Sequence, residues 1–381
     1  MQNIPHDNTR RYMTPFLNEP TYFYLAPNIE IPHHDIEKMS LQKRFRNKTQ
    51  TRGAHKPKPI RTTLILLVAL LTQPIYAQQP QQQNQRRRPP LPTVEQIMER
   101  LPDGVKFIPD IPYREGNKTW KLDLAMPEEH GDTPRPAIVF IHGGGWRNGD
   151  KRAGAFLQPT IDYAAKGYVC ITINYRMLDE APITACVEDV KNAVRWLRAH
   201  AEEYNIDPNR IGATGNSAGA HLSVMLALCP PSAGLEGDGP YREHSSMVQA
   251  VAASATPTSF LIPMSERARQ RKERARNGEA PQAQAPNSPQ LESEETRAKI
   301  SPMSYVTEDT PPILLFHEAS DRTVGVYHSD NLVDALRKAG SKDVNYILLG
   351  DGSGHGTYRR NLAFTEPARE AFFNRVLKSE D

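Results

Sequence analysis

A serine flanked by glycines constrains the fold of this chain more than any other feature. The string Gly215-Asn216-Ser217-Ala218-Gly219 has the form G-x-S-x-G and follows a short apolar run. Such a string is typical of a sharp turn between a strand and a helix, which exposes the serine hydroxyl above an α/β sheet. Glycine suits both flanking positions because the close crossing leaves no room for a Cβ atom. The string therefore predicts a serine nucleophile at Ser217.

A second glycine-rich string, HGGGW at residues 142–146, also follows an apolar run. In the fold that the first string predicts, a loop of this kind supplies backbone N–H groups to an oxyanion. We expect the N–H groups of Gly143, Gly144 and Ala218 to point at one oxygen and to stabilise the charge that develops as a carbonyl becomes tetrahedral. His142 is interpreted as a hydrogen-bonding residue that fixes this loop.

A serine hydroxyl needs an adjacent base, and a third group must hold that base in the right tautomer. In α/β hydrolases the chain order is serine, acid, histidine. We therefore expect the acid at Asp321, directly after a strand-like run, and the base at His355, within a glycine-rich loop after the last apolar run. Glu318 is the alternative acid, closer to the strand but less well placed.

Other titratable residues in this region are given structural interpretations. His317 is expected inside or at the end of a strand, and His328 at the start of a helix. Asp330 and Asp334 are expected to face solvent on that helix. His221, one turn after Ser217, is expected to pack beneath the serine.

Strand-like and helical patterns alternate from residue 105 onward. This alternation predicts a doubly wound, mainly parallel α/β sheet, with helices on both faces and the site at the carboxyl ends of the strands. Strands are expected at 105–108, 120–124, 137–141, 169–174, 210–214, 248–252, 313–316 and 344–349, and helices at 156–166, 185–203, 218–228, 327–339 and 365–377. The first two strands are expected to form an antiparallel pair.

The amino-terminal region differs in composition from the rest. Residues 1–92 carry 14 Lys and Arg against 5 Asp and Glu. Basic residues, the apolar run at 62–72 and a small residue at Ala77 together follow the three-part pattern of a secretory signal peptide. We expect cleavage after Ala77, with translation starting at Met39, and hence export to the periplasm or beyond without stable membrane insertion. The alternatives are an uncleaved anchor and an artefactual extension of a cytosolic protein. Residues 78–92, rich in Gln, Pro and Arg, are interpreted as a disordered linker.

The remaining residues, 93–381, suit one α/β domain. One segment at 266–299 is charged, then rich in Pro, Gln and Ala, and poor in apolar residues. We interpret it as an exposed insertion whose basic residues form a solvated face, not a nucleic-acid patch. The three cysteines, Cys170, Cys186 and Cys229, are assigned to packing. No cofactor or metal motif is found, so a cofactor-independent enzyme is expected.

Several strings together resemble a known family. They are HGGGWRNGDK from His142, Asn174-Tyr175-Arg176, the VEDVKNAVRWLR string that contains Asp189, GNSAGAHLS, and SDRTV. The chain resembles the hormone-sensitive-lipase-related esterases, and most closely the bifunctional feruloyl and acetyl-xylan esterases, over residues 105–378. The resemblance implies carboxylic ester hydrolysis, with the triad and oxyanion hole at the residues named above. Two departures are Glu318, where the family usually has glycine, and the long insertion.

These observations favour an exported serine carboxylesterase. The expected substrate is a small-molecule or polysaccharide ester, with acetyl or feruloyl esters of polysaccharides as the first hypothesis. Two alternatives are a peptidase or formamidase-type amidase on the same fold, and a non-catalytic binding protein of that fold. The presence of all three expected triad residues argues against the binding protein.

Overall fold

The computed structural model describes residues 90–265 and 292–378, and a few positions between these ranges. The expected signal peptide, nearly all of the expected linker and most of the insertion at 266–299 lie outside the described residues. In the part that is described, none of the helices has both the length and the apolar character needed to cross a bilayer.

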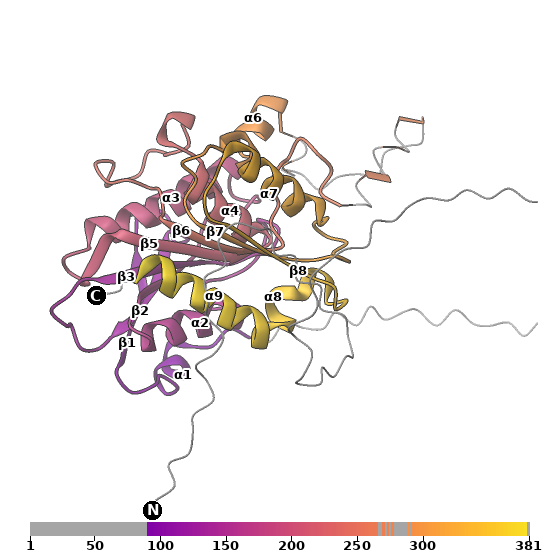
Figure 1. The fold of residues 1–381 in the computed structure, drawn as a ribbon. Coiled ribbons are helices and arrows are strands. Elements are labelled where there is room, and N and C mark those ends of the chain that lie inside the picture. Colours follow the sequence, from indigo (N-terminus) through magenta and orange to yellow (C-terminus); the bar gives the residue numbers. More distant parts are fainter. Residues whose placement is uncertain are drawn as a thin grey trace, which may run out of the picture. The chain divides into compact units, whose positions relative to one another are not determined.

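An eight-stranded sheet forms the centre of the fold (Figure 1). Its strands are β1 (Val105–Pro112), β2 (Lys121–Pro127), β3 (Arg135–Ile141), β4 (Val169–Ile173), β5 (Ile206–Asn216), β6 (Ala250–Ser254), β7 (Ile313–Glu318) and β8 (Val344–Leu349). The order across the sheet is β1-β2-β4-β3-β5-β6-β7-β8. Only the β1/β2 and β2/β4 pairs among these strands are antiparallel. The expected doubly wound, mainly parallel sheet and the antiparallel opening pair are confirmed.

Helices cover both faces of this sheet (Figure 1). They are α1 (Val94–Met98), α2 (Gly154–Ala165), α3 (Ile183–Ala199), α4 (Ala218–Leu228), α6 (Glu294–Lys299), α7 (Tyr327–Ala339), α8 (Thr357–Arg360) and α9 (Leu362–Leu377). Apolar residues of α2 and α9 share one core cluster with β3 and β7, whereas those of α3, α4 and α7 belong to the cluster on the other face. The end of the insertion, interpreted from composition as wholly exposed, forms α6, which begins at the capping residue Ser293.

The uninterrupted apolar run of β3 follows from this two-sided covering. Val139 and Ile141 belong to the cluster with α3 and α4, and Ile138 and Phe140 to the cluster with α2 and α9. All four side chains are fully buried. Since successive residues of a strand point to opposite faces, a strand with both faces covered must be apolar at every position. The strand ends at Ile141, directly before the HGGGW string.

The three cysteines are buried and unpaired. Burial raises the pKa of the thiols of Cys170, Cys186 and Cys229. A thiol held in its neutral form is a poor nucleophile and a poor metal ligand. Their assignment to packing is confirmed.

Candidate active site

Ser217 lies on a tight turn between the end of β5 and the start of α4. Its φ angle is +56°, a value that residues other than glycine seldom adopt. The turn is held by the Ser217 N–H, which donates to the Ser254 carbonyl at 2.9 Å. A Cβ atom at Gly219 would lie 2.0 Å from the Ile141 carbonyl oxygen. The turn therefore requires glycine there, as the sequence predicts, and presents the half-buried Ser217 hydroxyl at the carboxyl end of the sheet.

The structure brings Ser217, His355 and Asp321 together. Ser217 and His355 are 138 residues apart in the chain, and Asp321 and His355 are 34 residues apart. His355 Nε2 lies 3.0 Å from Ser217 Oγ, and His355 Nδ1 lies 2.8 Å from Asp321 Oδ2. Asp321 follows β7 and His355 follows β8, so each comes from a loop at the carboxyl end of a parallel strand. The three side chains form one hydrogen-bonded row.

Asp321 is held as a buried carboxylate. Burial alone would raise its pKa, but the neighbouring His317 and His355 rings outweigh burial and hold the pKa well below the ordinary value. Its Oδ1 also accepts the N–H groups of Thr323 at 2.8 Å and Val324 at 3.0 Å. An ionised Asp321 fixes the His355 tautomer in which Nδ1 carries the proton, leaving Nε2 free to accept one.

His317 lies within β7, as expected, and is fully buried beside Asp321. Its Nε2 lies 3.0 Å from the Val324 carbonyl and its Nδ1 lies 2.7 Å from Ser329 Oγ. The ring is thus held by one contact at each nitrogen. Asp330, expected to face solvent, is instead half-buried and accepts a hydrogen bond from the Tyr346 hydroxyl.

The glycine loop, residues 142–149, lies directly against the serine turn. A Cβ atom at Gly143 would lie 2.5 Å from the Asn216 carbonyl oxygen, and one at Gly144 would lie 1.6 Å from that of Asn148. Gly144 also has a φ angle of +127°. Within the described part of the chain, the N–H groups of Gly143, Gly144 and Ala218 have no hydrogen-bond acceptor. These three donors are thus available to a ligand oxygen.

A buried network beneath the loop was not predicted from the sequence. The Trp146 indole N–H donates to His221 Nδ1 at 3.3 Å, and His221 Nε2 donates to the Ile300 carbonyl at 2.8 Å. Phe260 packs edge-on against the His221 ring. Burial lowers the pKa of His221 to about 4, so the ring is neutral and its two nitrogens serve one donor and one acceptor. His221 is buried, as the sequence predicts. Its hydrogen-bond partner Trp146 directly follows the HGGG string, which is the one sequence feature that points to this contact.

Buried ion pairs fix the neighbouring segments. Lys151 Nζ lies 2.6 Å from the buried Asp123 carboxylate, and the Lys151 N–H donates to Asn174 Oδ1 at 2.7 Å. Arg176 and Asp189 pair at 2.8 Å. Four of these five residues belong to the strings that carry the family resemblance. Among the hydrogen bonds and ion pairs of the described residues, none joins these five to Ser217, His355 or Asp321.

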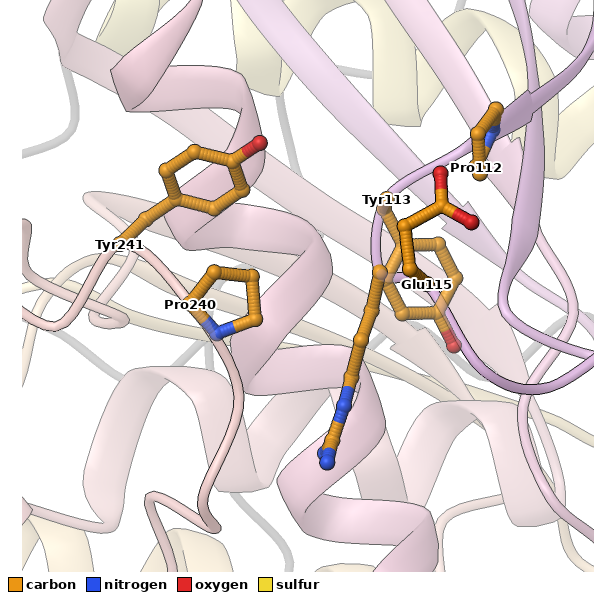
Figure 2. Close-up of a pocket in the computed structure, with 6 residues that line it drawn as sticks. Pro112, Tyr113, Glu115, Pro240 and Tyr241 are labelled. Atoms are coloured by element: carbon orange, nitrogen blue, oxygen red, sulfur yellow. The ribbon is translucent and has the colours of Figure 1, made fainter.

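A separate hollow of about 350 Å³ lies on the surface between two loops. Figure 2 shows Pro240 and Tyr241 on one side of it and Pro112, Tyr113 and Glu115 on the other. None of the three residues of the serine row lines it. Among the described residues, no group of three or more His, Cys, Asp and Glu side chains is arranged to hold a metal ion.

A mainly parallel sheet with a strand–serine–helix turn, and with an acid and a histidine from the loops after β7 and β8, defines an α/β hydrolase. Residues 122–336 match the BD-FAE family, and the chain belongs to that family.

Named relatives are esterases. The chain is 29% identical over 252 residues to a probable carboxylic ester hydrolase, LipM, of Mycobacterium tuberculosis, covering 63% of this chain and 54% of the relative. It is 28% identical over 261 residues to the esterase LipC of the same organism, covering 68% and 62%. The chain therefore spans between half and two thirds of the length of these two relatives.

Two solved structures share the fold over nearly their whole length. A truncated carbohydrate esterase from gut microbiota superposes with a TM-score of 0.59 at 26% identity, covering 72% of this chain and 97% of that one. Esterase 2 of Thermogutta terrifontis, phosphonylated by sarin, superposes with a TM-score of 0.58 at 25% identity, covering 73% and 98%.

Proposed function

We propose that this protein hydrolyses carboxylic esters through an acyl-enzyme on Ser217, with His355 as base and Asp321 as the residue that orients it. The observation that carries the proposal is the hydrogen-bonded row of these three side chains, with contacts of 3.0 and 2.8 Å. A serine hydroxyl is a weak nucleophile at its free pKa and requires such an arrangement. The family and the esterase names of the relatives support the same reaction.

The first half of the reaction forms the acyl-enzyme. Ser217 Oγ attacks the ester carbonyl carbon while its proton passes to His355 Nε2, and the imidazolium is stabilised by the ionised Asp321. The carbonyl oxygen becomes an oxyanion that the N–H groups of Gly143, Gly144 and Ala218 can bind. His355 then returns the proton to the departing alkoxide, which leaves as an alcohol.

The second half regenerates the serine. Water gives a proton to His355 Nε2 and attacks the acyl carbon, and the same three N–H groups bind the second oxyanion. Collapse of this intermediate releases the carboxylic acid, and the proton on His355 returns to Ser217 Oγ. The cycle consumes one water and needs no cofactor.

The proposed substrates are acetyl or feruloyl esters of polysaccharides. The support is the BD-FAE family together with structural relatives whose titles name a carbohydrate esterase and a bifunctional GH43-CE protein of Bacteroides eggerthii. Export is proposed on sequence grounds alone, from the signal-like segment that ends at Ala77. N-terminal sequencing of the exported protein tests it, and a mature chain that retains residues before Thr62 would refute cleavage.

Labelling with a fluorophosphonate probe tests the reaction class, because only an activated serine reacts. We expect the protein to be labelled at Ser217 and to hydrolyse p-nitrophenyl acetate. A panel containing acetylated xylan, methyl ferulate and a peptide or formamide substrate then tests the substrate class. Labelling at another residue, or hydrolysis of the amides alone, would contradict the proposal.

A further inference from the structure

Glu318 is a buried carboxylate that the proposed reaction does not use. It is the last residue of β7 and only 1% of its surface is exposed. No Lys, Arg or His among the described residues forms an ion pair with it. A buried charge without a counter-ion is costly unless hydrogen bonds stabilise it, so the partners of Glu318 show what it does.

Those partners lie in two loops that carry two different site residues. Glu318 Oε1 accepts the Gly352 N–H at 3.1 Å, and Oε2 accepts the Gly354 N–H at 2.9 Å. Oε2 also accepts the Ser320 N–H at 2.9 Å and the Ser320 hydroxyl. Gly352 and Gly354 belong to the loop that ends at His355, and Ser320 directly precedes Asp321. One carboxylate therefore joins the loops of the base and the acid.

The backbone of the histidine loop is shaped for this contact. Gly352 and Gly354 have φ angles of +74° and +56°, and a Cβ atom at either position would meet nothing within 4 Å. The glycines are therefore required by backbone conformation and not by lack of space. The N–H groups of these two glycines, on either side of Ser353, both point at the Glu318 carboxylate, whereas the Ser353 N–H donates to Asp351 Oδ1 at 3.0 Å. Backbone N–H groups that converge in this way form a concave site for an anion, and here the anion is Glu318 of the same chain.

We propose that Glu318 is a positioning residue that fixes the backbone on the amino-terminal side of His355, so that its ring stays between Asp321 and Ser217. The proposal rests on the proposed function. The His355 side chain is 27% exposed, and within the described part of the chain its ring makes two hydrogen-bond contacts, to Asp321 and to Ser217. Hydrogen bonds to an ionised acceptor are roughly twice as strong as neutral ones, so the carboxylate restrains the loop more firmly than an amide could. In this role Glu318 contacts neither substrate nor the reacting atoms.

Glu318→Gln tests the proposal. The amide keeps the size of the side chain but offers one acceptor oxygen, and it turns an N–H₂ group toward donors that need an acceptor. Because small displacements of a catalytic group cost up to about 10²-fold, we expect kcat for p-nitrophenyl acetate to fall by about 10- to 100-fold while KM changes by less than about twofold. The matched control is Asp343→Asn. Asp343 adjoins the opposite end of β8 and pairs with Arg375, so its loss should leave kcat within about twofold.

A double-mutant cycle with Asp321→Asn separates positioning from a general structural role. If Glu318 acts by keeping His355 against Asp321, its substitution should cost much less in the Asp321→Asn background than in the wild type. Equal costs in both backgrounds would overturn the proposal.

Hydrogen exchange on the wild-type protein supplies a test that does not depend on the variant folding. The amides of Gly352 and Gly354 should exchange slowly despite their place in a loop. Exchange at the rate of open, unbonded amides would overturn the proposal. Absence of fluorophosphonate labelling in the wild type would refute the proposed function, whereas equal labelling rates in the wild type and in Glu318→Gln would refute only the positioning role.

Discussion

The Trp146 indole donates a hydrogen bond to His221, joining the glycine loop to the helix that begins after Ser217. The two side chains are buried and 75 residues apart in the chain. The same histidine donates to the Ile300 carbonyl, just after α6. A neutral imidazole is the one form that can accept from Trp146 and donate to Ile300, so the position of the glycine loop depends on the protonation state of His221.

This dependence predicts an acid-sensitive fold. The pKa of His221 is about 4 in the folded protein, against about 6.5 in an unfolded chain. As the pH falls from 6.5 toward 4, the unfolded chain binds a proton that the folded protein does not, so the free energy of unfolding decreases across this window, by up to about 3 kcal/mol from this group. The lowered pKa of Asp321 acts at lower pH, because stability from that carboxylate is lost only as the pH falls through its folded value.

Urea unfolding at pH 7 and at pH 4.5 measures the effect. The midpoint should be lower at pH 4.5, and the difference should be smaller in His221→Gln, which keeps an amide in place of the ring but does not titrate. Equal midpoints for the wild type at the two pH values would contradict the prediction.

Ser217→Ala should abolish both ester hydrolysis and probe labelling. The hydroxyl carries no packing role, so the free energy of unfolding should change by less than about 0.5 kcal/mol. Circular dichroism and urea unfolding check the fold, and p-nitrophenyl acetate hydrolysis checks activity. Residual activity of more than a few per cent of the wild-type rate would place the nucleophile elsewhere.

Asp321→Asn should lower kcat by about 10⁴-fold, because an amide at this position favours the wrong histidine tautomer. Glu318→Gln should have a smaller effect, since Glu318 contacts loop amides and not the His355 ring. The two variants are compared in one assay under the same conditions. A larger loss for Glu318→Gln would mean that the acid has been assigned to the wrong residue.

Alanine substitutions at two adjacent glycines test the oxyanion donors. Gly144→Ala places a Cβ atom 1.6 Å from the Asn148 carbonyl oxygen, so the loop must move and kcat should fall by about 10²-fold or more. Gly145→Ala is the matched control. Gly145 also has a positive φ, +64°, but a Cβ atom there meets nothing within 4 Å, so this variant should lose about 1–2 kcal/mol of stability and little activity. Similar kcat values for the two variants would argue against a role for the Gly144 N–H.

Two deletions test the insertion. Removing residues 266–291 with a short Gly/Ser linker should leave stability nearly unchanged, because the segment is poor in apolar residues and loop length enters stability only logarithmically. We expect a change in KM for polymeric esters and an unchanged kcat for p-nitrophenyl acetate.

Extending the deletion through Lys299 should also impair hydrolysis of the small ester. It removes α6, where Arg297 donates to the Phe260 carbonyl and the Lys299 carbonyl accepts from Tyr305. If the shorter deletion already slows p-nitrophenyl acetate hydrolysis in a folded protein, the segment helps to build the site.

Local patterns in the sequence predicted most of the fold. The continuous apolar runs of β3 and β4 identify buried strands, and the bounds of α4, α7 and β8 agree with those expected. The helix expected at 185–203 runs from Ile183 to Ala199, because Pro182 can precede a helix and no strong capping signal marks its end. The insertion is the clearest difference. Its composition predicts no helix, and the only signal for α6 is the single capping residue Ser293.

The sequence also indicated which residues would meet in the site, because the serine, the acid and the histidine each follow a strand of a parallel sheet in the order typical of α/β hydrolases. It could not indicate contacts that depend on tertiary packing. The His221–Ile300 hydrogen bond joins segments 79 residues apart, and the Glu318 contacts depend on the positive φ angles of Gly352 and Gly354. From the sequence, Glu318 is an alternative acid and a departure from the family's usual glycine. Its role in joining the two loops has no sequence signature, because its partners are backbone amides and the Ser320 hydroxyl.

Because all three cysteines are buried, a thiol-reactive probe can be directed to a single introduced cysteine. With no accessible native thiol, a cysteine introduced at an exposed position would be the single site of rapid maleimide reaction. Leu362, at the start of α9 and 41% exposed, lies seven residues after His355. A fluorophore could therefore be attached at Leu362→Cys alone, without removing any other cysteine first.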